Sequence, residues 1–215
     1  ILLGLGGSAT NDGGCGCAAA LGVGFLDADG QSFVPVGDTL GRIARIDTVK
    51  AEALLRGVKL TVMCDVTNPL YGPTGAAYVF APQKGADAEK VKSLDAGLRH
   101  FGDVIRSQLG IDVSRMPGAG AAGGMGAGCV ALLGGMIQSG IDAVLDVTGF
   151  DRQLEGADLV ITGEGRIDSQ SAGGKVISGV ARRTKAKGIP LIAIAGGIAD
   201  SAGAVYDIGV SAMFS

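Results

Sequence analysis

Hydrophobic residues recur along the chain in two patterns, and each pattern predicts a different kind of element. The clearest helix covers residues 88–109, and Gly110 stands just past its end, as is typical of helix termination. Its apolar positions recur every three or four residues and form one stripe. The stripe consists of Val91, Leu94, Leu98, Phe101, Ile105 and Leu109. This spacing predicts one long helix that packs against a core.

Continuous apolar runs predict buried strands instead, because a strand covered on both faces needs no polar side. We expect such strands at residues 1–5, 58–64, 157–161, 191–195 and 211–214, whereas 76–80 fits a short strand or a helical turn. Residues 23–26 form a short apolar run that a turn at 27–30 closes. Further helices are expected at residues 15–21, 127–138 and 175–187.

The alternation of apolar strands with helices predicts an α/β fold with parallel sheets that helices cover on both faces. The pattern changes after Gly149, so we place a domain boundary near residue 150. Residues 1–150 are then a glycine-rich α/β domain, and residues 151–215 are part of a second α/β domain. Since the chain begins inside a predicted strand and without Met, we expect it to be part of a longer protein.

Composition narrows the class of protein further. The formal net charge is −3, and no basic face typical of nucleic-acid binding is seen. No apolar run is long enough to span a membrane, and no signal peptide is recognisable. The basic residues at 182–187 lie in the last turns of a predicted helix, where cations are favourable. We therefore expect a cytoplasmic protein with reduced, mostly buried cysteines and neither a nucleic-acid nor a membrane partner.

Polar loops follow several of the predicted strands, and they carry the candidate chemistry. They supply the carboxylates Asp12, Asp65, Glu164, Asp168 and Asp200. Glycine-rich turns add backbone N–H groups that can bind anions. Carboxylates with such turns, and with no suitably placed histidine, favour phosphoryl transfer. For each single Asp, helix capping or a turn remains the alternative.

The first glycine loop fits more than one ligand. Gly4-x-Gly6-x-x-Ala9 follows a predicted strand and precedes a helix, as a dinucleotide-binding fingerprint requires. The loop nevertheless extends through Asn11-Asp12-Gly13-Gly14, beyond a tight turn, and the helix is short. A P-loop is absent, because Val176 follows Gly173-Gly174-Lys175. A dinucleotide, another phosphate or a plain turn all remain open on spacing alone.

Four long motifs resemble the glycerate 2-kinase family. They are GLGGSATNDGG (4–14), CDVTNPLYGPTGAAYVFAPQKGA (64–86), GAGAAGGMGAG (118–128) and DLVITGEGRIDSQSAGGK (158–175). The resemblance implies a kinase that uses ATP and Mg²⁺ to convert D-glycerate to 2-phosphoglycerate. It also implies two α/β domains, one with a Rossmann- or flavodoxin-like sheet present here only in part, and an active site in the cleft between them. Family members extend further at both ends, so we expect this chain alone to lack part of the site, and whether it is active by itself stays open.

Candidate roles follow from the matched motifs. The substrate- or phosphate-binding candidates are Gly6, Gly7, Ser8, Thr10, Asn11, Asp12, Asn68 and Lys84. Glu164 and Asp168 are candidates for the general base and a metal ligand, Arg166 for charge neutralisation, and Asp65 for binding Mg²⁺. Asp12 is equally well explained as a helix cap. Lys84 is a weaker phosphate candidate, because a surface lysine is the commoner outcome.

Two other functions remain open at this point. One is an NAD(P)-dependent oxidoreductase that acts on a small hydroxy acid, which the fingerprint at residues 4–9 allows. The other is a non-catalytic ligand-binding domain. The sequence also leaves open whether the protein forms a homodimer.

Overall fold

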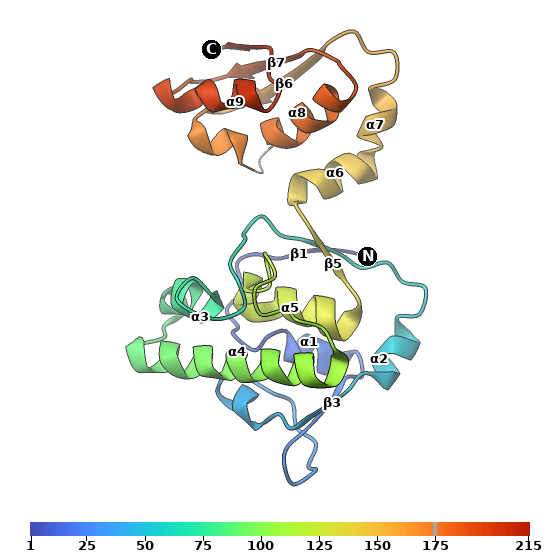
Figure 1. The fold of residues 1–215 in the computed structure, drawn as a ribbon, viewed down its shortest axis with the longest axis vertical. Coiled ribbons are helices and arrows are strands. Elements are labelled where there is room, and N and C mark those ends of the chain that lie inside the picture. Colours follow the sequence, from blue (N-terminus) through green and yellow to red (C-terminus); the bar gives the residue numbers. More distant parts are fainter. Residues whose placement is uncertain (174–175) are drawn as a thin grey trace. The chain divides into compact units, whose positions relative to one another are not determined.

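The computed structural model describes residues 1–173 and 176–215. Contacts divide them into two compact units, Ile1–Gln138 and Ser139–Ser215, each with its own hydrophobic core (Figure 1). Helix α6 (Gly140–Thr148) belongs to the second unit by these contacts, whereas a boundary near residue 150 would assign it to the first.

A three-stranded parallel sheet in the order β1-β4-β5 organises the first unit. In its central register, Leu3 pairs with Val62 and Val62 pairs with Ile137. A separate antiparallel pair joins β2 to β3. The strands are β1 (Leu2–Gly4), β2 (Gly24–Leu26), β3 (Arg45–Asp47), β4 (Thr61–Met63) and β5 (Met136–Gln138). The helices are α1 (Cys15–Ala20), η1 (Gly37–Arg42), α2 (Val49–Leu54), α3 (Ala76–Phe80), η2 (Pro82–Lys84), α4 (Ala88–Leu109) and α5 (Ala121–Leu133).

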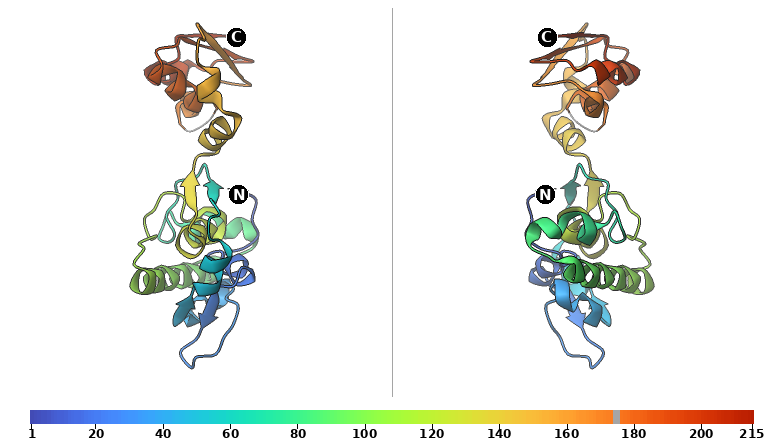
Figure 2. Two further views of the ribbon diagram at one scale, coloured as in Figure 1. Left: turned by 90° about the vertical axis from the view of Figure 1, so that its right-hand side faces the viewer. Right: turned by 90° about the vertical axis from the view of Figure 1, so that its left-hand side faces the viewer.

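Helix α4 has the bounds that its apolar stripe predicts. The Asp87 side chain accepts a hydrogen bond from the Lys90 N–H at 2.8 Å, and this satisfies an open donor of the first turn. Gly110 ends the helix in the left-handed conformation, with φ of 71°. Leu98, Phe101 and Ile105 are fully buried against the core, and α4 lies beside α5 (Figure 2).

Helix α5 corrects the prediction of a helix at residues 127–138. Its bounds are Ala121–Leu133, with a kink of left-handed backbone at residues 122–124, and it ends because Gly134 takes a left-handed conformation with φ of 65°. The segment Met136–Gln138 then forms β5, because its backbone pairs with β4 in the parallel sheet. Local apolar character could not separate these two elements; the sheet partner decides between them.

The second unit contains the parallel sheet β6-β7-β8, in which Ile192 pairs with Ile161 and with Ala212. Strand β6 lies later in the chain than predicted, because its ladder begins where the Val160 N–H bonds to the Pro190 carbonyl. The strands are β6 (Val160–Glu164), β7 (Leu191–Ala195) and β8 (Ala212–Phe214). The remaining helices are α7 (Phe150–Gln153), η3 (Ser169–Ala172), α8 (Val176–Ala186), η4 (Asp200–Gly203) and α9 (Ala204–Asp207). The predicted start of α8 at Lys175 lies outside the described residues.

Only one face of this second sheet is covered within the described residues. Leu191, Ala193 and Ala195 of β7 are buried, and they share a core cluster with Ile177 and Ala181 of α8. The alternate positions are open: Ile161 is 60% exposed, Ile194 49% and Phe214 57%. The expectation that helices cover both faces of this sheet is therefore not met in these residues.

The basic end of α8 makes ion pairs within the second unit. The Arg183 guanidinium contacts the carboxylates of Asp142 and Asp146 of α6 and of Asp151 of α7. Arg182 also pairs with Asp142, at 2.8 Å. These side chains connect α8 to its neighbouring helices, which supports a structural role for the basic cluster. In the part of the chain that the structure describes, no helix is both long and apolar enough to cross a membrane.

The four cysteines are free, and their environments predict different reactivities. Cys17 is exposed, whereas Cys15, Cys64 and Cys129 are buried. Burial raises the pKa of the Cys129 thiol to about 11, and it also raises the pKa of Cys15 and of Cys64. Because the thiolate is the reactive form, a thiol reagent at pH 8 is expected to label Cys17 first. Mass spectrometry should show that Cys17→Ser removes the fast phase; rapid labelling of Cys15 would contradict this packing.

Candidate functional site

The long loop between β1 and α1 forms one wall of the candidate site. The Leu5 N–H bonds to the Met63 carbonyl and extends the contact with β4 just past the end of β1. Beyond it, Gly7, Gly13 and Gly14 take left-handed conformations, with φ of 59°, 66° and 78°. Glycine reaches these angles with little strain, so the chain can fold back on itself before α1 begins.

Asp12 caps the start of α1. Its Oδ1 accepts the Gly14 N–H and its Oδ2 accepts the Gly16 N–H, each at 3.0 Å. A carboxylate at this position satisfies donors that the first turn of the helix leaves open. Of the two explanations that the sequence allows for Asp12, the structure therefore displays the capping contacts.

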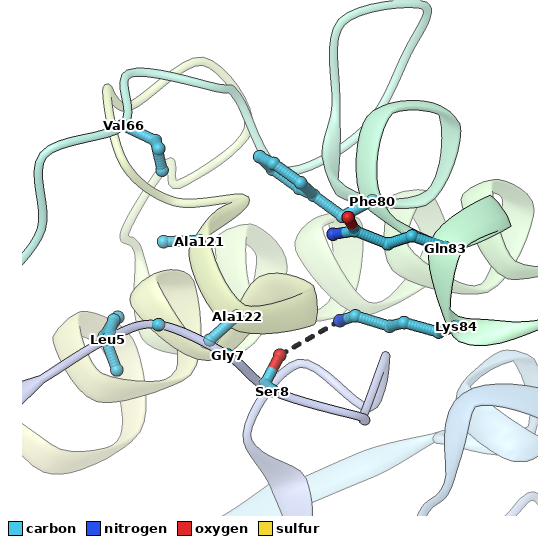
Figure 3. A pocket seen from close by; sticks show the side chains of 10 residues that line it. Leu5, Gly7, Ser8, Val66, Phe80, Gln83, Lys84, Ala121 and Ala122 are labelled. Carbon is cyan, nitrogen blue, oxygen red and sulfur yellow. Dashed lines mark hydrogen bonds between the residues drawn. The ribbon is translucent and has the colours of Figure 1, made fainter.

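Lys84 reaches across to this loop from η2, and Figure 3 shows its side chain beside Ser8. Its Nζ donates to the Ser8 Oγ at 3.0 Å and to the Thr10 carbonyl at 2.6 Å. Burial lowers the pKa of Lys84, and the Asp12 charge acts in the opposite direction. Lys84 is thus a fixed, half-buried cation rather than a freely solvated surface lysine.

These groups border a cavity of about 220 Å³ (Figure 3). Ser8, Gln83 and Lys84 supply its polar side chains, and Gly6 and Gly7 contribute backbone. The apolar lining consists of Leu5, Val66, Phe80, Ala121 and Ala122. An apolar pocket with a few converging polar groups is the usual form of a small-molecule site. The cation and the glycine backbone favour a small anionic ligand.

A strained backbone segment lies at the rim of this cavity. Ala122 has φ of 52°, and it is the one non-glycine residue with positive φ in the described part of the chain. Gly123 and Gly124 follow with φ of 71° and 92°. Left-handed backbone at a residue with a Cβ costs about 1–2 kcal/mol and tends to occur at functional sites. The strain therefore supports a functional interpretation of this cavity.

Sequence reasoning missed several lining residues. Gln83 immediately precedes Lys84 in the motif at 64–86, so it could have been included with Lys84. Phe80 and Ala122 could not have been identified from the sequence, because the sequence pattern does not distinguish an apolar residue that lines a pocket from one in the core.

The other predicted residues of the first unit have different environments. Thr10 contacts Lys84 through its carbonyl, and its side chain is exposed. The Asn68 Nδ2 donates to the Thr74 carbonyl at 2.8 Å, which shapes its own loop. Asp65 is exposed and stands beside Val66 of the cavity. Both amide atoms of Asn11 are buried and lack a hydrogen-bond partner among the described residues.

The candidates of the second unit lie at the carboxyl end of β6. Glu164 is the last residue of this strand, and its Oε2 is buried without a hydrogen-bond partner among the described residues. The Asp168 N–H donates to the Ser171 Oγ at 3.1 Å, and Arg166 is exposed. Backbone bonds of Ile167 to Gly197 and Ala199, both at 2.9 Å, attach this loop to the loop after β7. The structure thus brings Glu164 and Asp168 to the same edge of the parallel sheet.

Comparison with known proteins places these motifs in one family. The whole chain, residues 1–215, matches the profile of the Glycerate kinase family. A glycerate kinase of Bacillus cereus is 52% identical over 215 residues, which are 100% of this chain and 56% of that protein. The glycerate 2-kinase of Escherichia coli K12 is 46% identical over 215 residues, again 100% of this chain and 56% of that protein.

A solved structure agrees with this result. A crystal structure assigned to glycerate kinase 2 of Salmonella typhimurium LT2 matches with a TM-score of 0.83 at 45% identity. The match covers 100% of this chain and 56% of that one, so the chain spans little more than half the length of these relatives. The α/β class predicted from the strand and helix pattern is confirmed. On the match over its whole length, the chain belongs to the glycerate kinase family.

Proposed function

We propose that the protein containing this chain is an ATP-dependent kinase that phosphorylates D-glycerate to 2-phosphoglycerate. Family membership supports the glycerate substrate, and the relatives' names include a glycerate 2-kinase. The observation that carries the proposal to particular residues is the Lys84 ammonium, held at the cavity by Ser8 and Thr10. A fixed cation beside glycine backbone is suited to a carboxylate or a phosphate.

In this proposal, the first unit binds the anionic groups. Lys84 and Ser8, with the backbone of Gly6 and Gly7, hold the glycerate carboxylate or a phosphate. Such a cradle orients the substrate. Its donors are in place before the reaction, so they stabilise negative charge on the bound groups without having to rearrange. Thr10 acts through its carbonyl, which positions the lysine. Asp12 acts indirectly, because its capping contacts set the course of the loop.

The second unit contributes carboxylates. We infer that Glu164 or Asp168 accepts the proton of the glycerate 2-hydroxyl while its oxygen attacks the γ-phosphorus of ATP. The bond from that phosphorus to the β–γ bridging oxygen then breaks, and ADP leaves. Arg166, which is exposed at the same loop, is available to neutralise phosphate charge.

The residues present are compatible with Mg²⁺. Among residues 1–173 and 176–215, no three or more His, Cys, Asp or Glu side chains form a cluster. Mg²⁺ in kinases needs only one or two protein carboxylates, because waters and phosphates supply its other ligands. Glu164 has a buried oxygen in need of a partner, and Asp65 and Asp168 also follow parallel strands. When bound, Mg²⁺ neutralises phosphate charge.

The alternative of a dinucleotide-dependent oxidoreductase is less well supported. In that class, a pyrophosphate binds to free N–H groups at the helix N-terminus after the glycine turn. Here the Asp12 carboxylate already accepts the N–H groups of Gly14 and Gly16. Its negative charge at this position would also repel a pyrophosphate. Helix α1 is only six residues long, so it provides a weak dipole.

A coupled assay of the full-length protein tests the proposal. With Mg²⁺ present, ATP consumption is expected to depend on D-glycerate. Glycerol is the matched control, because it keeps the hydroxyl groups and lacks the carboxylate. Unchanged ATP turnover on adding glycerate would refute the substrate. Glycerate binding without turnover would favour the ligand-binding alternative, and enhanced NADH fluorescence on adding protein would favour the oxidoreductase. A cytoplasmic location and a homodimer stay predictions.

A further inference from the structure

The first unit contains a second cavity, which is lined by two arginines, whereas the candidate site is lined by one lysine. Its volume is about 490 Å³, and the loop after β4, helix α4 and the loop after α4 line it. Its lining includes two arginines, Arg99 and Arg115, and three hydroxyl side chains, those of Thr67, Tyr71 and Ser114. No carboxylate is among the residues that line it in the described part of the chain.

Arg99 is held at this cavity by its neighbours on α4 and the loop. Its guanidinium lies over the Tyr71 ring, 4.3 Å from the ring centre. The Asp95 Oδ2 is 3.7 Å away, which is too long for a hydrogen bond, and the Asp95 Oδ1 accepts the Gly72 N–H at 2.6 Å. Stacking on Tyr71 and the ion pair with Asp95 thus orient the guanidinium, and the Asp95 contact is too long to take up one of its hydrogen-bond donors.

The second arginine stands on the opposite loop. Arg115 directly follows Ser114, whose N–H and Oγ both bond to Asp112 Oδ1, at 2.9 and 2.6 Å. These bonds, with the Leu70 N–H donating to the Ser114 carbonyl at 3.2 Å, hold the loop against the segment after β4. The Asp112 carboxylate therefore takes its hydrogen bonds from Ser114, which lower its pKa, and the Arg115 charge contributes to the same shift only through space.

We propose that this cavity is a phosphate-binding site, separate from the Lys84 cavity, with Arg99 and Arg115 as its principal ligands. Two guanidinium groups present planar pairs of N–H donors that match the oxygens of a phosphate dianion. Thr67 supplies a further hydroxyl donor. The site takes free phosphate or the phosphate group of a small monoester, since both present the same oxygens.

Phosphate titration by calorimetry tests this site at fixed low ionic strength. Full-length Lys84→Met is the parent protein, so that anion binding at the candidate site does not contribute. Inorganic phosphate and glycerol phosphate are titrated in separate arms, and the tighter ligand identifies the source of the phosphate. Arg99→Gln and Arg115→Gln are each expected to weaken binding about tenfold or more, as for loss of a charged hydrogen bond.

Arg106→Gln is the matched control. Arg106 lies on the same helix, is similarly exposed and pairs with Asp103 at 2.9 Å, so this variant should leave phosphate affinity within about twofold. Thermal melts check that the two cavity variants fold. Equal phosphate affinity in the parent, Arg99→Gln and Arg115→Gln would overturn the proposal, as would the absence of phosphate binding in the parent. An equal loss of phosphate affinity in Arg106→Gln would mean that the effect reflects the net charge of the protein rather than a specific site, and it would also overturn the proposal.

Discussion

Replacing Lys84 with methionine is expected to lower kcat/KM of the full-length protein for glycerate about 100- to 1,000-fold. This magnitude is typical for loss of one charged donor in a preorganised site. The ammonium bonds to the Ser8 Oγ and the Thr10 carbonyl, and methionine keeps much of the side-chain volume while losing both contacts. The cost in stability should be about 1–3 kcal/mol, because the lost hydrogen bonds are donated by a charged group. Steady-state kinetics and denaturant unfolding measure the two effects separately.

Lys90→Met is the control for Lys84→Met. Lys90 is an exposed lysine that pairs with Asp38 at 2.8 Å, outside the cavity, so its loss should leave kcat/KM within about twofold. If Lys84→Met retains full activity, the cavity is not the anion site. A loss explained entirely by unfolding would assign Lys84 a structural role.

The pH profile gives an independent readout of Lys84. Burial lowers its pKa from the ordinary 10.5, so the folded protein releases this proton at a lower pH than a solvated lysine does. If the charged form binds substrate, kcat/KM should fall as the pH rises through this lowered pKa. Lys84→Arg, which stays charged, is expected to shift that alkaline limb upward wherever it retains activity.

Gly128→Ala is expected to destabilise the protein by about 3 kcal/mol, as measured by urea unfolding. Helix propensity alone predicts the opposite sign, because alanine favours a helix interior over glycine by about 1 kcal/mol. A Cβ at Gly128 would, however, overlap the Gly13 carbonyl oxygen of the glycine loop. Backbone atoms cannot move aside as a flexible side chain can, so overpacking outweighs propensity.

Gly41→Ala is the control for Gly128→Ala. No atom lies within 4 Å of a Cβ built at Gly41, and this residue lies in η1 of the same unit without a positive φ. We expect a change within about 0.5 kcal/mol. A Gly128→Ala protein that is more stable than the parent would show that α5 does not pack this closely on the loop.

Several elements could be predicted from the sequence because the residues that determine their bounds lie within the element or next to it. Helix α4 carries its own stripe, a capping Asp87 and a terminating Gly110, so its bounds need no partner to be predicted. Strand β7 has the predicted bounds for a similar reason, since its five apolar residues lie between Pro190 and Gly196. The segments at 121–138 gave the wrong boundary, because a glycine-rich run has neither periodicity nor caps that separate helix from strand.

The candidate site, too, could be predicted only in part from the sequence. The four motifs were enough to indicate the family and to direct attention to Ser8, Thr10 and Lys84. They could not show that Lys84 contacts Ser8, because these residues are 76 positions apart and meet only through the packing of η2 on the glycine loop. They also left Asp12 between two roles; its bonds to Gly14 and Gly16 are capping contacts, and a role toward a ligand stays a prediction.

The sequence by itself determined the α/β class, the main helix and strands, and the resemblance to a kinase family, because these depend on periodicity and on contiguous motifs. The tertiary structure decided which polar groups face a cavity, at which glycines a Cβ would clash and which arginines line the second cavity. Those properties depend on contacts between distant segments, and no spacing along the chain encodes a distance through space.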